Sequence, residues 1–430
     1  MIRSLKISNV GPAPEMTLAF GERLNLLTGD NGLGKSFLLD IVWWALTRKW
    51  PAEVNAKLTS GKKALPSREG KASIKFTFGG KAKEESYEST YDRKEQAWTG
   101  RAGRPSNPGL VLYAQVDGSF AVWDEARNYW RKKGLIDVQD RLPAYVFSPT
   151  EVWDGLPEGL SKKVCNGLIL DWAGWQKEGG KPFKNLCAVL EALSPPGEEK
   201  IVPGELTRIS LDDSRDIPTL KMSYGQEVPV LHASAGTKRI IALAYLLIWA
   251  WEEHKNASRL LDQGTTKQII FLIDEIESHL HPRWQRCIIK TLLSVMGSLA
   301  QQANVQIIAA THSPLVLASV EPVFDPKKDA WFDLDYEGRN HQRKVVLTRR
   351  DYELHGEVSN WLTSEAFDLP SARSLESEQL LETASKLIEK TDVGPKEVAA
   401  MQDRLASALS PKDPFLFRWR AICEKKGLLK

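Results

Sequence analysis

The segment GDNGLGKS, residues 29–36, has the residue types and spacing that bind a nucleoside triphosphate. It fits the pattern GxxxxGK[ST] and lies between an apolar run, predicted to be a strand, and a helix predicted over 35–49. Glycines let such a loop wind tightly, so that backbone N–H groups and the start of the helix face the phosphates. Lys35 would neutralise the β- and γ-phosphates, and the Ser36 hydroxyl would be a ligand of Mg²⁺. The expected ATP-binding residues of this loop are Asn31, Gly32, Gly34, Lys35 and Ser36.

Two carboxylates follow a second apolar run, in the segment IIFLIDEIESHLHP. The run predicts a buried strand, and ligands of open α/β sheets bind at the carboxyl ends of the strands. Asp274 is therefore predicted to hold Mg²⁺, together with Ser36. Glu275, one residue further on, is the natural general base for the attacking water. The alternative is that two acids merely open a helix, where the helix dipole favours them.

A third apolar run, in IIAATHSPLVL, ends at His312. A histidine at this strand end could hydrogen-bond the γ-phosphate and respond to its loss. Taken alone, a histidine at a strand end is more often structural. We favour a functional role for His312 because three strand ends are predicted to converge on one site.

The stretch HASAGTKRI, residues 232–240, places very small residues before a long apolar helix expected over 236–253. In one interpretation Ser234 is an ordinary N-cap of a buried helix. In another, Ser234 and the backbone N–H groups of Gly236 and Thr237 form an anion site. Both interpretations can hold at once.

The order P-loop, small-residue helix start, Asp-Glu and His resembles ABC-type ATPases of the SMC/RecF/OLD branch. Within that branch it most resembles the PtuA-type ATPases of antiphage systems, which are associated with Septu and retrons. The resemblance covers about 1–50 and 220–320, and DEIESHLHPRWQ is specific to this branch rather than to transporters. Two features depart from it, because Thr237-Lys238 replaces the Gly-Gln or Gly-Glu of transporters and the intervening residues lack the heptads of an SMC arm.

The resemblance implies an ATP- and Mg²⁺-dependent ATPase head that dimerises head to tail. Ser234 and Gly236 would then form the signature motif, which contacts the γ-phosphate bound to the other subunit. The small residues there would let the second backbone approach closely. The branch also implies a glutamine at a strand end near the site, and Gln115 in YAQVDGS is the residue that fits.

The predicted fold class is α/β, a P-loop NTPase head of ABC type with an antiparallel β-rich lobe and a helical C-terminal region. Short alternating runs between 51 and 219 predict antiparallel strands, and a helix is expected from about 282 to 302. The expected organisation is an ATPase head over 1–350, followed by a helical region over 351–430. Within the head we expect a P-loop segment over 1–50, an insertion over 51–219, a signature-to-histidine segment over 220–322 and closing strands over 323–350.

Composition points to an ordinary soluble globular protein. Of 430 residues, 42% are hydrophobic and 26% are charged, and the net charge of +3 does not by itself indicate nucleic acid. The four cysteines form no CxxC pair, which argues against zinc and favours a reducing compartment. The longest apolar run, 240–251, is shorter than the ~20 residues of a membrane span. We therefore expect a cytoplasmic protein without a membrane partner.

The leading functional hypothesis is an antiphage-defence ATPase that forms a homodimer or a higher even-numbered oligomer. Its ATP cycle would gate a partner effector, an HNH or other nuclease. The alternative is a RecF-like repair or recombination ATPase that clamps DNA. A transporter subunit is disfavoured by HLHP and by the short, strand-rich lobe. Tryptophans that could stack bases are more often core residues; these are Trp123, Trp130, Trp172 and Trp175.

A nuclease of the OLD type with a TOPRIM domain is also disfavoured. Asp333, Asp335 and Glu337 offer its acids, but in reverse order and within one predicted β-hairpin. The sequence therefore predicts an ATPase that is not itself a nuclease.

Overall fold

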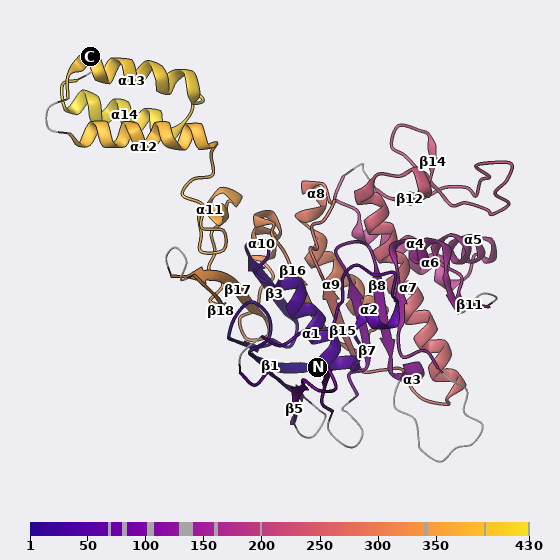
Figure 1. Cartoon of the computed structure of the whole chain (residues 1–430). Helices are drawn as coiled ribbons and strands as arrows, with labels where there is room; N and C mark the ends of the chain where they lie inside the picture. Colours follow the sequence, from indigo (N-terminus) through magenta and orange to yellow (C-terminus); the bar gives the residue numbers. More distant parts are fainter. Residues whose placement is uncertain are drawn as a thin grey trace. The chain divides into compact units, whose positions relative to one another are not determined.

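A computed structural model describes most of the chain (Figure 1). The described residues are 1–67, 70–79, 84–100, 107–128, 141–158, 162–197, 200–338, 343–390 and 393–428. Trp130, one of the tryptophans named above, lies outside them. The chain divides into two compact units, Met1–Gly356 and Glu357–Lys430, which we describe separately.

An eight-stranded sheet forms the centre of the first unit, in the order β18-β17-β3-β16-β15-β7-β8-β9. The middle five strands pair in parallel, and the outer strands β18, β8 and β9 pair in antiparallel fashion. The strands are β3 (Leu24–Gly29), β7 (Leu110–Ala114), β8 (Phe120–Asp124), β9 (Tyr145–Phe147), β15 (Gln268–Ile273), β16 (Asn304–Ala310), β17 (Ala330–Glu337) and β18 (Lys344–Arg350). Their parallel register brings the ends of β3, β7, β15 and β16 to one edge, where the P-loop, Gln115, Asp274 with Glu275, and His312 follow.

The strand β15 shows why this sheet forms. Its five residues from Ile269 to Ile273 are all apolar and at most 2% exposed, which is typical of a parallel strand that is covered on both faces. Each such side chain gains about 1.5–3 kcal/mol from burial. The sheet can therefore hold a polar residue rigidly at the end of the strand.

The helix α1 (Lys35–Thr47) lies between this sheet and a second, antiparallel sheet. Trp43 packs against Tyr113 of β7, with ring centroids 6.0 Å apart, and Trp44 packs edge-on against Phe76 of the second sheet at 6.4 Å. The order in the second sheet is β2-β1-β4-β5-β6. Its strands are β1 (Ile2–Ser8), β2 (Glu15–Ala19), β4 (Ser73–Gly79), β5 (Glu84–Asp92) and β6 (Ala97–Trp98).

Helices from the middle of the chain pack beside the end of the central sheet. The helix that follows Ser234 is α7 (Ala235–Leu260), which continues beyond the expected end near 253, and its Trp249 packs edge-on against Tyr145 and Phe147 of β9. The helix expected over 282–302 is instead two helices, separated at Arg286 and Cys287. The helices after α1 are α2 (Pro51–Val54), α3 (Glu125–Asn128), α4 (Pro149–Asp154), α5 (Leu168–Glu178), α6 (Lys181–Leu193), α8 (Pro282–Gln285), α9 (Ile288–Leu299) and α10 (Pro314–Val320).

Two small antiparallel sheets also come from the middle of the chain. The second of them leads, through a short 3₁₀ helix, directly into Ser234. Their strands are β10 (Leu156–Glu158), β11 (Lys162–Cys165), β12 (Val202–Pro203), β13 (Thr219–Lys221) and β14 (Glu227–Pro229), and the 3₁₀ helix is η1 (Val230–His232).

The strand β7 corrects one expectation. Its predicted antiparallel pairing is confirmed with β8, but its other edge pairs in parallel with β15, from Ile269↔Leu110 to Ile273↔Ala114, so it belongs to the central sheet rather than to a separate lobe. The physical reason is that all five of its residues are buried, so that it can form only where both of its faces are covered. Gln115 is consequently placed beside Asp274.

The second unit is a small helical bundle, which confirms the predicted helical C-terminal region. Apolar positions of three amphipathic helices form its core, including Leu380, Val398, Leu405 and Trp419. The helices are α11 (Val358–Leu362), α12 (Leu375–Glu389), α13 (Pro395–Ala408) and α14 (Pro414–Lys425). Among the described residues of the whole chain, no helix is both long enough and apolar enough to cross a bilayer.

Candidate nucleotide site

The P-loop connects β3 to α1 and leaves the helix start open. Gly34 is the N-cap of α1 with φ of 102°, a left-handed conformation that favours glycine. No side chain caps the helix and no acid occupies its first turn, so the free N–H groups and the helix dipole can receive an anion. Asn31 and Gly32 are exposed at the tip of the loop.

Lys35 is buried below this loop, with 5% exposure. Its Nζ donates hydrogen bonds to the carbonyl oxygens of Gly29 at 2.7 Å and Asp30 at 2.9 Å. Burial lowers the pKa of Lys35, and the nearby charges of Asp274 and Glu275 oppose that shift. Two carbonyl oxygens therefore hold the ammonium at the edge of the sheet. Phosphate oxygens could take the place of these two acceptors.

Asp274 and Ser36 form the pair that was predicted to bind Mg²⁺. Asp274 is 2% exposed at the end of β15, and a hydrogen bond joins its carboxyl to the Ser36 side chain. Burial raises the pKa of Asp274 to about 6, against the effect of that hydrogen bond. Its Oδ1 has no hydrogen-bond partner among the described residues. A buried carboxylate oxygen without a partner, next to a hydroxyl, suits Mg²⁺, which binds through one or two protein oxygens and substrate phosphates.

Glu275 follows in a strained backbone conformation. Its φ is +42°, in the left-handed region that non-glycine residues seldom adopt. Its charge influences Asp274, Lys35 and His312, so all four groups lie close together. Strain of this kind persists where surrounding contacts fix the backbone, and it is concentrated at functional sites.

His312 lies two residues beyond the end of β16 and is partly buried. Burial lowers its pKa, and the charge of Lys35 lowers it further, while Glu275 and Asp30 act in the opposite direction. A neutral imidazole beside Lys35 can donate to or accept from a polar group at the same sheet edge. The structure thus brings together Lys35, Ser36, Asp274, Glu275 and His312.

Gln115 lies directly after β7 and is fully buried. Its Oε1 accepts a hydrogen bond from the Ser119 hydroxyl, and its Nε2 has no partner within normal hydrogen-bond geometry among the described residues. Its carbonyl oxygen accepts a hydrogen bond from Arg239 at 2.7 Å, and the other Arg239 amine lies 3.4 Å from the carbonyl oxygen of Asp274. Sequence reasoning missed Arg239, although its position in the first turns of α7, after Lys238, was a usable signal.

Ser234 is exposed at the start of α7 and accepts a hydrogen bond from the Thr237 N–H at 3.2 Å. The N-cap interpretation is therefore confirmed. Gly236 also permits a close approach within its own chain, because a Cβ at this position would lie 2.5 Å from the carbonyl oxygen of His279. Its expected contact with a second chain stays a prediction.

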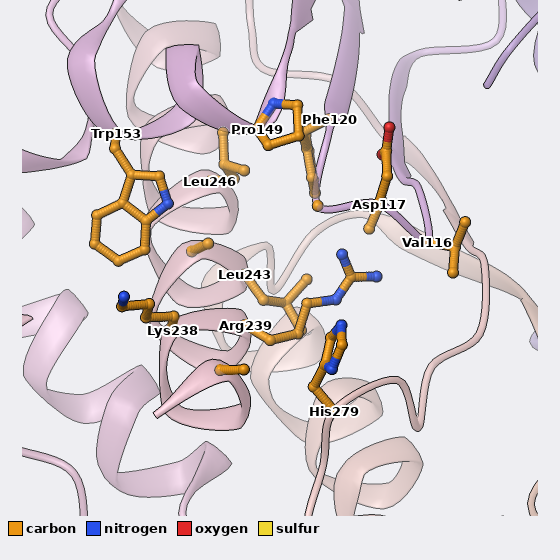
Figure 2. A pocket seen from close by; sticks show the side chains of 14 residues that line it. Val116, Asp117, Phe120, Pro149, Trp153, Lys238, Arg239, Leu243, Leu246 and His279 are labelled. Carbon is orange, nitrogen blue, oxygen red and sulfur yellow. The ribbon is translucent and has the colours of Figure 1, made fainter. Parts of the chain in front are cut away.

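A pocket of about 220 Å³ adjoins the first turns of α7. Figure 2 shows Arg239 and Lys238 on one side of it, Trp153 beside Lys238, and Asp117 opposite Arg239. The pocket lies between the turn that follows Gln115 and the helix that follows Ser234. These two segments are thus close neighbours in space.

The acidic residues near 333–337 lie in the hairpin of β17 and β18, as predicted. Asp333 is 2% exposed and accepts a hydrogen bond from the Thr28 hydroxyl at 2.7 Å. Burial raises its pKa to about 6. Within the ranges that the structure describes, no three His, Cys, Asp or Glu side chains group as a metal site. Among the described tryptophans that could stack bases, Trp123 and Trp172 are buried and Trp175 packs against Tyr245, which agrees with the expectation that they are core residues.

A family model described as "AAA domain, putative AbiEii toxin, Type IV TA system" matches residues 24–318, from β3 to α10. This range contains every predicted site residue. The chain belongs to this AAA-domain family. The predicted recognition as an ABC-type ATPase similar to PtuA is thereby confirmed.

Three relatives show how far the similarity extends. The Septu protein PtuA of Bacillus thuringiensis is 24% identical over 73% of this chain and 72% of that protein. The Retron Vc95 probable ATPase of Vibrio cholerae serotype O1 biovar El Tor is 30% identical over 28% of this chain, and the Retron Ec83 probable ATPase of Escherichia coli is 28% identical over 46%. This chain spans only 22% and 32% of the two retron proteins.

Among solved structures, the SMC head domain from Thermotoga maritima covers 81% of this chain and 99% of its own length. The sequence identity is 13% and the TM-score is 0.38, and this likeness adds nothing to the functional argument.

Proposed function

We propose that this chain binds ATP with Mg²⁺ and hydrolyses it. The observation that carries the proposal is the convergence of Lys35, the Ser36–Asp274 pair, Glu275 and His312 at one edge of the parallel sheet. A cation, a metal-type oxygen pair, a general base and a neutral imidazole in one place are the groups that phosphoryl transfer to water requires.

Each residue has a role that follows from its position. The start of α1 and Lys35 receive the phosphates, since Lys35 can exchange two loop carbonyls for phosphate oxygens. Ser36 and Asp274 would hold Mg²⁺, which supplies charge neutralisation on the phosphates. Glu275 accepts the proton of the attacking water. His312 hydrogen-bonds the γ-phosphate, and Gln115 extends the polar edge on the side of β7.

The proposal includes a head-to-tail dimer, or a higher even-numbered oligomer, in which Ser234 of one copy faces the phosphate site of the other. Its support is that Ser234 is exposed at the start of a long helix, whereas Lys35, Asp274 and His312 are partly or fully buried. A helix start that carries a hydroxyl is a favourable anion site. Two copies would therefore share two nucleotides.

We further propose that the ATP cycle serves antiphage defence in the cytoplasm by gating a partner effector, an HNH or other nuclease. The similarity to Septu PtuA and to retron ATPases supports this assignment over RecF-like clamping of DNA. Asp274 and Glu275 are assigned to the nucleotide, so the chain itself would not cut DNA.

The test uses purified full-length protein with ATP, with Mg²⁺ or Mn²⁺, and with supercoiled and linear DNA. We expect ATP hydrolysis without DNA cleavage, and cleavage when a nuclease encoded beside this gene, tested as the proposed effector, is added. DNA cleavage by this chain alone that survives further purification and disappears in one of its own point mutants would contradict the proposal. Tight ATP-dependent DNA binding without any effector response would favour the RecF-like alternative.

A further inference from the structure

The chain between Asp274 and α8 is fixed by two overlapping turns. The N–H of Ser278 donates to the carbonyl oxygen of Glu275, and the N–H of Leu280 donates to that of Glu277, each at 2.8 Å. The buried Ile276 donates its N–H to the carbonyl oxygen of Ala310, the last residue of β16, at 3.2 Å. Glu277 is therefore held at a defined place beside the end of β16.

Both carboxylate oxygens of Glu277 are used at that strand end. Oε2 accepts a hydrogen bond from the Thr311 hydroxyl at 2.7 Å, and Oε1 accepts one from the backbone N–H of His312. The Thr311 hydroxyl in turn accepts from the N–H of Ser313 at 3.0 Å. Glu277 thus fixes Thr311 and the backbone of His312, and this backbone sets the position of the His312 imidazole.

Further hydrogen bonds hold the segment after β16 in the same place. The Ser313 hydroxyl donates to Oε1 of Gln285 at 2.6 Å and accepts from the N–H of Val316 at 3.1 Å, which caps α10. The Gln285 amide donates to the carbonyl oxygen of Leu280 at 2.8 Å. A closed ring of bonds therefore joins the segment after β15 to the segment after β16.

We propose that Glu277 is a positioning residue for His312, a role that rests on the proposed ATPase function. Both of its oxygens are directed at Thr311 and the His312 N–H, so we assign the general base to Glu275 alone. Its carboxylate ties the histidine's backbone to the segment that carries Glu275, so that the base and the imidazole keep a fixed separation at the γ-phosphate. Positional errors of about 1 Å at such groups can cost about 100-fold in rate.

The test is a double-mutant cycle on ATP hydrolysis by the full-length protein. We expect His312→Ala to lower kcat about 100-fold, as the loss of one phosphate donor does. Glu277→Ala should lower kcat at least about 10-fold in the wild-type background but less than about 2-fold in His312→Ala, because residues that act as a unit are not additive. Calorimetric ATP affinity should stay nearly unchanged in both single variants.

Two variants guard against simple misfolding. Glu277→Gln keeps an acceptor for the His312 N–H and should recover most of the activity, whereas Thr311→Val removes only the hydroxyl contact and should give a smaller loss. Glu321→Ala is the matched control, since Glu321 accepts from the N–H groups of His355 and Gly356 at 2.9 and 3.0 Å, away from the site. Its kcat should equal that of the wild type.

Independent effects of Glu277→Ala and His312→Ala, multiplying in the double variant, would overturn the inference while leaving the ATPase proposal intact. Absence of ATP hydrolysis in the wild type would instead remove the proposed function itself. A Glu277→Gln variant as slow as Glu277→Ala would show that charge at this position, rather than hydrogen bonding to His312, controls the rate, and would also overturn the inference.

Discussion

The proposed site has a nucleotide half, formed by Lys35, Ser36, Asp274, Glu275 and His312, and a signature half, formed by Ser234 and the start of α7. In the nucleotide half, Lys35 and Asp274 are at most 5% exposed and His312 is partly buried, whereas Ser234 in the signature half is exposed. The nucleotide half is made by neighbouring strands of one sheet, and its groups influence one another's pKa values. The hydrogen bonds of the Ser234 hydroxyl that the structure shows go to Thr237, within the same helix start. One chain therefore supplies every group of the nucleotide half, whereas the signature half is exposed, as the proposed dimer requires.

The largest expected effect is the loss of ATP binding when the nucleotide half is damaged. Lys35→Ala removes the buried cation that faces the phosphates, so ATP binding should be abolished. Isothermal titration calorimetry measures this directly, with Lys238→Ala, outside the loop, as a comparison that should still bind. An unchanged ATP affinity of Lys35→Ala would show that the P-loop assignment is wrong.

The next effect shows how the two halves depend on each other. Glu275→Gln should bind ATP normally and hydrolyse it at least about 100-fold more slowly, because the general base is lost. The variant should then accumulate as an ATP-bound dimer, visible by light scattering after size exclusion. Adding Ser234→Arg to this variant should return it to the monomer. Persistent turnover in Glu275→Gln would place the base elsewhere.

The smallest expected effect is a change in the stability of the ligand-free protein, caused by Asp274 in the nucleotide half. Burial raises the pKa of Asp274 from 3.8 to about 6, so the folded state holds this proton more tightly than the unfolded state. Its contribution to stability therefore falls as pH rises from about 4 to about 6, and at pH 7 the ionised carboxylate costs about 1–3 kcal/mol.

Asp274→Asn should consequently stabilise the ligand-free protein by about that amount at pH 7 while abolishing Mg²⁺-dependent hydrolysis. Thermal unfolding at pH 7 and pH 4.5 measures the difference, which should shrink at the lower pH. A variant that is less stable than the wild type at pH 7 would contradict this account of the site.

Much of the nucleotide half could be predicted from the sequence because its signals are local. The glycine spacing before Lys35, and the apolar runs that end at Asp274 and His312, each report a strand or helix end within a few residues. The parallel pairing of β7 could not be predicted in this way, since it depends on a partner strand about 160 residues away. Short alternating strings do not tell which sheet a strand joins.

The contacts that sequence reasoning missed are also long-range. Glu277 was recognised as belonging to a specific motif, yet its bonds to Thr311 and His312 join two different strand ends. Gly236 was predicted to face a second chain, which stays a prediction, and the structure adds a close approach to the carbonyl oxygen of His279 in its own chain. In both cases the residue type indicated a functional position, but the sequence did not identify the residue that it contacts.

The most direct test of the central claim, that each site combines the nucleotide half of one copy with the signature half of another, is ATP hydrolysis by mixed variants. Ser234→Arg places bulk where the partner's γ-phosphate must lie, and Lys35→Ala cannot bind ATP, so each should be inactive alone. In a heterodimer one site carries both defects and the other carries neither. An equal mixture should recover up to about a quarter of the wild-type rate, since half of the dimers have one intact site of two. No recovery at any mixing ratio would contradict a signature that acts on the other copy.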